Sequence, residues 1–192
     1  MKSDKRQDFV VAIGASAGGL AAIQSLIAEL PDRLNAPIVI GVHSMQGAVL
    51  TEALQSESNL KIKRAEDNQT LEKGWIYVLP GAMHGFFRNG KIHLSEPVRD
   101  SGFRPSIDAM FMTLAAEYKD RAIAVVLSGM LTDGMRGAQV IYDMGGRTIV
   151  QEPSDAEHSS MPNSVIRNDH PEVIHTATDL GKWLSSHIGK MT

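Results

Sequence analysis

The architecture of this chain can be traced to residues 9–19, which read FVVAIGASAGG. The apolar run at the start is typical of a buried strand, the glycines of a tight turn, and the following stretch 20–30 of an amphipathic helix. Within it, Gly14, Ser16 and Gly18 fit the G-x-S-x-G nucleophile elbow, in which a sharp turn exposes the serine hydroxyl. The helix that follows offers unpaired N–H groups to a developing oxyanion. Ser16 is therefore a candidate nucleophile.

The same glycines also resemble a dinucleotide-binding turn, which requires G-x-G-x-x-G. Ser16 takes the place of the middle glycine of that motif. The next apolar run, residues 36–42, ends in His43 rather than in the Asp or Glu that would bind a ribose. An imidazole can instead accept a proton from a serine. These departures disfavour a nucleotide site, while a purely structural glycine turn stays open beside the catalytic interpretation.

The length and composition of the chain disfavour or exclude several classes of function. The 192 residues suit one domain, which we expect at residues 9–188 between polar tails at 1–8 and 189–192. The net charge of −3, with both signs interspersed, disfavours nucleic-acid binding. With no apolar run of about 18 residues and no signal peptide, we expect a cytoplasmic protein without membrane insertion. The absence of cysteine excludes disulfides, thiolate metal sites and a cysteine nucleophile. Seven histidines leave a histidine and carboxylate metal site open, although we expect neither a metal nor a cofactor.

Strand and helix patterns alternate along the chain. Buried strands are predicted at residues 10–13, 37–42, 75–79, 122–127 and 148–150, helices at 20–30, 46–56, 105–118, 135–144, 162–167 and 177–188, and a hairpin with an Asn-Gly turn at 86–94. Pro105 and Pro162 are predicted to begin their helices. This alternation predicts an α/β fold: a doubly wound, mostly parallel sheet with an inserted β-hairpin, in a Rossmann-like three-layer sandwich. Sites in such sheets form beyond the carboxyl ends of the strands.

Three residues that follow predicted strands form a chemically coherent set. Ser16 follows the first strand, His43 the second, and Asp133 lies in the loop after the strand at 122–127. Serine, histidine and aspartate make an acyl-transfer triad, in which the serine attacks, the histidine moves the proton and the aspartate fixes the imidazole. Their order along the chain differs from the Ser, Asp, His order of α/β-hydrolases. The set predicts a serine hydrolase that arose by convergence.

Each member has an alternative explanation. His43 could be a structural, hydrogen-bonded histidine, and Asp133 could be the N-cap of the helix that starts after Gly134. His84 also follows a strand, so it could replace His43 as the base, line the cleft, or join it in a metallohydrolase site. A further loop near the same edge carries Asp155 and His158.

A larger set of segments carries a family resemblance. These segments are Gly14 to Gly19, His43, Leu79-Pro80-Gly81 with His84, Arg104-Pro105-Ser106-Ile107-Asp108, Ser128 to Gly134, and Met161-Pro162. Together they resemble the catalytic domain of bacterial chemotaxis protein-glutamate methylesterases (CheB). The resemblance implies a doubly wound sheet, hydrolysis of methyl esters on chemoreceptor glutamates and deamidation of glutamines. It places the catalytic roles on Ser16, His43 and Asp133, and oxyanion-binding N–H groups on Ala17 and Met130.

The resemblance also implies partners. The substrate would be the cytoplasmic helices of methyl-accepting chemoreceptors, approached across loops where Arg104 and Arg136 could attract receptor carboxylates; the alternative for both arginines is ordinary solvation. Relatives commonly carry a receiver domain before this unit, whereas only residues 1–8 precede the first strand here. We therefore expect activity without a phosphodonor, and any regulation to come from a separate protein or from receptor access. The alternative functions are a non-catalytic signalling or binding module and a serine esterase for a different ester.

Overall fold

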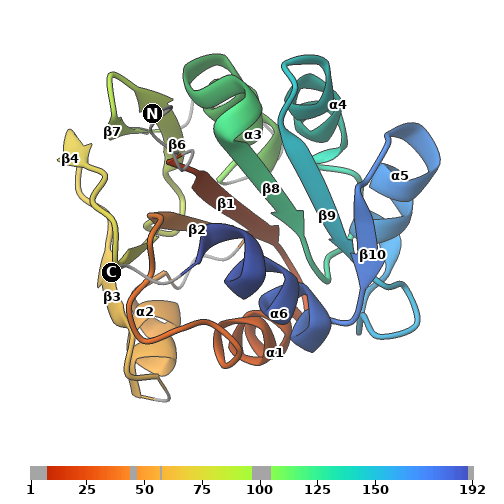
Figure 1. The fold of residues 1–192 in the computed structure, drawn as a ribbon, viewed down its shortest axis with the longest axis horizontal. Coiled ribbons are helices and arrows are strands. Elements are labelled where there is room, and N and C mark those ends of the chain that lie inside the picture. Colours follow the sequence, from red (N-terminus) through yellow and green to blue (C-terminus); the bar gives the residue numbers. More distant parts are fainter. Residues whose placement is uncertain (1–7, 44–46, 57, 97–104, 190–192) are drawn as a thin grey trace, which may run out of the picture.

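A parallel sheet forms the centre of the molecule (Figure 1). The structure is a computed structural model that describes residues 8–43, 47–56, 58–96 and 105–189. The strands of this sheet are β1 (Val10–Ala15), β2 (Ile38–Val42), β3 (Lys61–Arg64), β5 (Trp75–Val78), β8 (Ala122–Val126), β9 (Arg147–Gln151) and β10 (Val173–His175). In the described part of the chain their order is β10-β9-β8-β1-β2-β5-β3, and every neighbouring pair is parallel.

Helices cover both faces of the sheet, as Figure 1 shows. One face carries α1 (Gly19–Ile27), α2 (Gly47–Ser56) and α6 (Ala177–Ile188), and the other carries α3 (Ile107–Tyr118), α4 (Met135–Asp143) and α5 (Ser160–Asn168). A short 3₁₀ helix, η1 (Lys119–Arg121), follows α3. The three layers explain why the central strands are continuous apolar runs, since side chains on both faces of the sheet are buried there.

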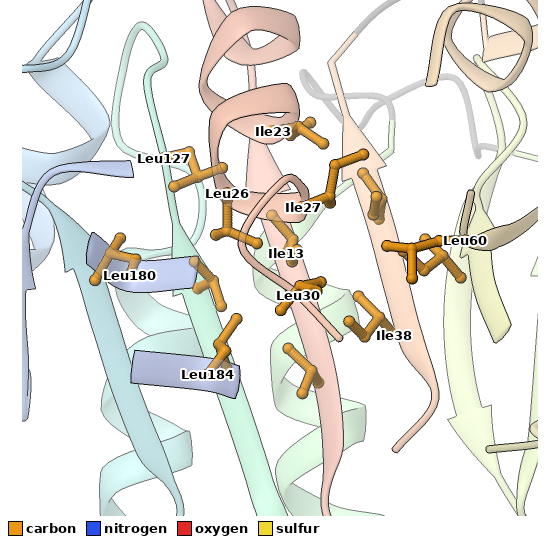
Figure 2. Packing of buried hydrophobic residues seen from close by; sticks show 14 of the residues in the cluster. Ile13, Ile23, Leu26, Ile27, Leu30, Ile38, Leu60, Leu127, Leu180 and Leu184 are labelled. Atoms are coloured by element: carbon orange, nitrogen blue, oxygen red, sulfur yellow. The ribbon is translucent and has the colours of Figure 1, made fainter. Parts of the chain in front are cut away.

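Alternate residues of β1 enter two separate cores. Val11 and Ile13 pack toward α1 and α6, whereas Val10 and Ala12 pack toward α3. Figure 2 shows the first core, in which Leu26 of α1 lies close to Ile13. Burial of one such Leu or Ile side chain contributes about 1.5–3 kcal/mol. Both faces of the central strand are therefore packed, and the residues that follow it have a defined position.

A small antiparallel sheet stands beside the main one. It contains β4 (Gln69–Thr70), β6 (His84–Arg88) and β7 (Lys91–Ser95). Asn89 and Gly90 have φ of 52° and 70°, as a two-residue type I′ hairpin turn requires. The predicted hairpin is confirmed, with β4 as an added strand.

The predicted fold class is confirmed. The predicted and observed elements differ at the edges of the two sheets and at the starts of two helices. Strands β3, β4 and β10 were not predicted, because each is short and none is a continuous apolar run. Pro162 is wrongly placed at a helix start, since α5 begins two residues earlier at Ser160. Pro105 precedes its helix, whose N-cap is Ser106. No helix within the described ranges has the length and apolarity needed to cross a membrane.

The strand order reverses at β1. The chain runs from β1 through α1 to β2 on one side, and it later places β8 on the other side. Open α/β sheets bind their ligands at such a reversal, beyond the carboxyl ends of the strands. The residues that follow β1, β2 and β8 therefore meet at one edge.

Candidate active site

Ser16 lies in the turn between β1 and α1. Its N–H donates to the carbonyl of Ser128 (2.9 Å), and its own carbonyl accepts from the N–H of Gly19 (2.9 Å). Gly18 has a φ of 73°, and a Cβ at this residue would lie 2.6 Å from Ser128 Oγ and 2.7 Å from Glu157 Cβ. Only glycine accepts this conformation in so little space. The backbone thus holds Ser16, half-buried, at the carboxyl end of the central strand.

His43 follows β2, and a buried carboxylate orients its ring. The backbone N–H of His43 donates to the carbonyl of Ala15 (3.1 Å), which places the histidine beside the end of β1. Ring Nε2 lies 2.7 Å from Asp133 Oδ2, and the two side chains are 12% and 2% exposed. Because a carboxylate only accepts hydrogen bonds, the ring proton belongs on Nε2 and the neutral ring has its lone pair on Nδ1. In the chymotrypsin-type triad the aspartate contacts Nδ1 instead.

Asp133 is anchored by the first turn of α3. Its Oδ2 accepts from the N–H of Ile107 (2.7 Å) and its Oδ1 from the N–H of Asp108 (2.8 Å). Burial by itself raises the pKa of Asp133, but the hydrogen bonds from His43, Asp108 and Ile107 outweigh burial and lower the pKa below its ordinary value. Asp133 is therefore ionised at neutral pH and able to stabilise a protonated imidazole.

Asp133 is not the N-cap of α4, so the alternative role considered for it is wrong. The N-cap of α4 is Gly134, which makes no side-chain capping bond. The carboxylate at this end of α4 comes from Asp108, whose Oδ1 accepts from the N–H groups of Gly134 (2.9 Å) and Gly137 (2.8 Å). Burial raises the pKa of Asp108, and the nearby charge of Asp133 acts in the same direction. Sequence reasoning quoted Asp108 in a motif but gave it no role.

The loop after β8 places backbone donors beside the serine. A Cβ on Gly129 would lie 2.9 Å from Ser16 Cβ, so this backbone touches the candidate nucleophile. The next residue, Met130, is 52% exposed. Neither Ala17 nor Met130 has an acceptor for its N–H among the described residues. Two N–H groups are therefore available near Ser16, as an oxyanion site requires.

A hydrogen-bond network supports the loop after β8. The fully buried Ser128 donates its Oγ–H to the carbonyl of Ala17 (2.8 Å), and this Oγ accepts from the N–H of His158 (3.0 Å). The N–H of Ser128 donates to Gln151 Oε1 (2.8 Å), and Gln151 Nε2 donates to Asp155 Oδ2 (2.7 Å). Sequence reasoning quoted Ser128 in a motif without a role and missed Gln151; the available signal was a polar residue at the end of each buried strand.

A cleft of about 550 Å³ lies over Ser16 and His43. It is bounded by the turn after β1, the start of α1, the end of β2, the start of α2 and the loop before α5. Most of its wall is apolar, as suits an ester or the stem of a glutamyl side chain. Its described apolar side chains are Ala17, Leu20, Ala21, Val42, Val49 and Leu50, and its polar ones are Ser16, Gln24, His43 and Glu157.

The remaining predicted site residues lie elsewhere. His84 is buried in β6, and its Nδ1 accepts from the N–H of Ser106, so it supports the start of α3. Among the described residues that line the cleft, His84 is absent. Arg136 is exposed in the first turn of α4, and Arg104 lies outside the described residues. Within the described ranges, no three or more histidine and carboxylate side chains form a cluster that could hold a metal. The catalytic roles of Ser16, His43 and Asp133 stay predictions, although their placement suits them.

Known proteins are similar to this chain in sequence. Residues 11–184 match the family model of CheB methylesterases. The chain is 34% identical over 190 residues to protein-glutamate methylesterase/protein-glutamine glutaminase 2 of Methanosarcina acetivorans, covering 94% of this chain and 53% of that protein. It is 33% identical over 180 residues to protein-glutamate methylesterase/protein-glutamine glutaminase 4 of Myxococcus xanthus, covering 92% of this chain and 51% of that protein. The chain thus spans about half the length of these two relatives.

A solved structure is similar over nearly the whole chain. The crystal structure of the Thermotoga maritima CheB methylesterase catalytic domain superposes with a TM-score of 0.88 and 31% sequence identity, covering 93% of this chain and 98% of that domain. Sequence and structure therefore agree over the same region, and this chain belongs to the CheB methylesterase family.

Proposed function

We propose that this chain is a serine hydrolase that removes methyl esters from glutamate side chains of chemoreceptors. The observation that carries the proposal is the 2.7 Å contact between His43 Nε2 and Asp133 Oδ2, beside a cleft that Ser16 also lines. A buried, ionised aspartate that orients a histidine next to a half-buried serine turn is the constellation of acyl-transfer enzymes. The names of the relatives, protein-glutamate methylesterase/protein-glutamine glutaminase, support this substrate class.

In the first half of the reaction, Ser16 Oγ attacks the γ-carbonyl carbon of the ester. His43 Nδ1 takes the hydroxyl proton as the bond forms, and Asp133 stabilises the resulting imidazolium. The carbonyl oxygen becomes an oxyanion, for which the N–H groups of Ala17 and Met130 are the donors. Collapse of the tetrahedral intermediate breaks the bond to the methoxy oxygen, which leaves as methanol with the proton from His43. The product is a glutamyl ester of Ser16.

In the second half of the reaction, a water molecule is the nucleophile that hydrolyses the ester of Ser16. His43 removes a proton from the water as its oxygen attacks the acyl carbon, and it returns the proton to Ser16 Oγ when the acyl bond breaks. The side chain is released as a carboxylic acid, which loses its proton to solvent and becomes a carboxylate. A glutamine amide in the same position would release ammonia in place of methanol, so glutaminase activity needs no further group.

The partner in this proposal is the cytoplasmic part of a chemoreceptor, so the proposal includes a cytoplasmic location for the chain. Leu20, Val49, Met130 and Leu131 are between 41% and 58% exposed. Leu20 and Val49 line the cleft, and Met130 and Leu131 lie in the loop after β8. Apolar side chains around a site suit a substrate presented on the surface of another protein.

The direct test is methanol release from a peptide that carries a γ-methyl glutamyl ester. We expect the wild-type protein to release methanol and Ser16→Ala to be slower by about 10⁴-fold or more, since the triad acts as a unit. The variant should keep its far-UV spectrum and melting temperature, because Ser16 is held through its backbone. A fluorophosphonate probe should label the wild type at Ser16 and leave the variant unlabelled. Substantial hydrolysis by folded Ser16→Ala would disprove the mechanism, and an unlabelled wild type would favour a non-catalytic binding module.

A further inference from the structure

The cleft above Ser16 contains one feature that the proposed mechanism does not use. Among its described lining residues, Glu157 is the only one that carries a carboxylate. Neither proton transfer nor oxyanion binding requires a negative charge at this place. A developing oxyanion is in fact destabilised by a nearby anion, so the presence of Glu157 calls for a physical explanation.

The backbone of Glu157 is attached to the site. The next residue, His158, donates its N–H to Ser128 Oγ (3.0 Å) and accepts at its carbonyl from the N–H of Gly129 (2.9 Å). Ser128 and Gly129 belong to the loop after β8, which contacts Ser16. Glu157 is therefore fixed relative to the nucleophile by its main chain, even though its side chain is 69% exposed.

The carboxylate of Glu157 has a defined direction. Its Oε1 lies 3.6 Å from His158 Nε2. On the other side, Oε2 lies 3.0 Å from the position that a Cβ on Gly18 would occupy. Gly18 is two residues from Ser16, so this oxygen faces the turn that holds the nucleophile. The negative charge thus sits on the wall of the same cleft that Ser16 lines.

We propose that Glu157 is a specificity-determining residue that makes the cleft favour uncharged acyl side chains, such as a glutamyl ester or amide, over the free glutamate carboxylate. The inference rests on the proposed function. A substrate protein that carries glutamyl esters also presents unmodified glutamates, and each hydrolysis creates another one. Repulsion by Glu157 keeps those carboxylates from occupying the cleft and speeds the departure of the product.

The expected effect is modest because Glu157 is exposed. In a water-like dielectric, like charges about 8 Å apart change a binding constant by about two- to three-fold at low salt. The effect should decrease with ionic strength, because the screening length falls from about 30 Å at 0.01 M to about 3 Å at 1 M.

The test compares two blocked peptides that differ only in charge, acetyl-Ala-Glu-Ala-amide and acetyl-Ala-Gln-Ala-amide. Each is used to protect Ser16 from a fluorophosphonate probe, and the ratio of the two protection constants is measured for the wild type and Glu157→Gln. Taking the ratio removes any general change in the affinity of the cleft. The matched control is Glu152→Gln, since Glu152 is exposed in the same loop and is absent from the described lining of the cleft.

We expect the wild type to prefer the glutamine peptide, and the preference to fall about two- to three-fold in Glu157→Gln and in the wild type at high salt. Glu152→Gln should behave as the wild type does. An unchanged ratio in Glu157→Gln, or an equal fall in Glu152→Gln, would overturn the inference. A wild-type protein that the probe does not label would instead count against the proposed hydrolase, which keeps the two failures distinguishable.

Discussion

Asp133 accepts hydrogen bonds from three donors while only 3% of the residue is exposed. Two of them, the N–H groups of Ile107 and Asp108, are backbone groups of α3 that have no partner within their own helix. The third is His43 Nε2. One carboxylate thus completes a helix start and orients the candidate base, so stability and activity are coupled at this residue.

Asp133→Asn is expected to damage both properties. The asparagine NH₂ group has to face a donor, either His43 or a backbone N–H, so one buried donor loses its acceptor. Loss of an acceptor for a buried donor costs about 1–3 kcal/mol of unfolding free energy. The wrong imidazole tautomer lowers kcat by about 10⁴-fold in a serine protease triad, and we expect a fall of similar order. Urea denaturation and methanol release measure the two effects, and a variant with near-wild-type kcat would remove Asp133 from the mechanism.

The stability cost of Asp133→Asn should depend on pH. The pKa of Asp133 is lower in the folded protein than in the unfolded chain, where it is about 3.9. The carboxylate therefore contributes its full stabilisation above about pH 4, and this contribution is lost as the pH falls through the folded value. The difference in unfolding free energy between wild type and variant should shrink below about pH 4. A difference that stays constant from pH 6 to pH 3 would contradict the ionised, hydrogen-bonded state of Asp133.

Sequence reasoning found Ser16 and His43 because each directly follows an apolar strand. Asp133 was ambiguous, since an aspartate before Gly134 and a helix is also a common capping pattern. The structure resolves the ambiguity with a contact to α3, 25 residues earlier in the chain. A local pattern contains no information about which distant helix end will face a loop.

At the level of elements, a carboxylate at the start of each of α3 and α4 accepts hydrogen bonds from backbone N–H groups at the start of the other helix. Asp133 lies just before α4 and binds N–H groups of α3, while Asp108 lies in α3 and binds N–H groups of α4. The two helices also pack against each other. The exchange fixes their relative position, and the loop that carries Asp133 and Met130 is fixed along with them.

Asp108→Ala should therefore destabilise the pair of helices. The N–H groups of Gly134 and Gly137 would lose their acceptor, at a cost of about 1–3 kcal/mol of unfolding free energy. Hydrolysis should slow as well, because the loop before α4 loses its anchor. Asp108→Asn keeps an oxygen at Oδ1 and is the matched control, for which we expect a much smaller loss. Equal losses in chemical denaturation would show that charge, rather than the acceptor, is what matters here.

The elements that escaped prediction lie at the sheet edges. Strand β3 carries Lys61 and Lys63, and the ammonium of Lys63 lies 4.4 Å from the centre of the Trp75 ring. A lysine can cover an aromatic face with its stem while its charge stays in water. The sequence of such a strand is partly polar, whereas the central strands are apolar runs. Hydrophobic patterns therefore predict the central strands and miss the edge strands.

At the scale of the whole molecule, the alternation of strands and helices was sufficient to predict the doubly wound sheet and the edge where the site would lie. It could not predict how the site is supported. Ser128 after β8, Gln151 at the end of β9 and Asp155 in the next loop form a chain of hydrogen bonds, and Asp155 Oδ2 also accepts from the N–H of Ala177 at the start of α6 (2.9 Å). The candidate site is thereby connected to a helix on the opposite side of the sheet from α3 and α4.

Gln151→Ala tests this connection. Gln151 is 2% exposed and supplies the acceptor for the N–H of Ser128, so its loss should cost about 1–3 kcal/mol of unfolding free energy and slow ester hydrolysis through the loop beside Ser16. Asp155→Ala should cost less, because Asp155 is exposed. The double variant should lose less stability than the sum of the single losses, since either change breaks the bond between Gln151 and Asp155. Urea denaturation of the four proteins measures this coupling, and strictly additive losses would mean that the two residues stabilise the molecule independently.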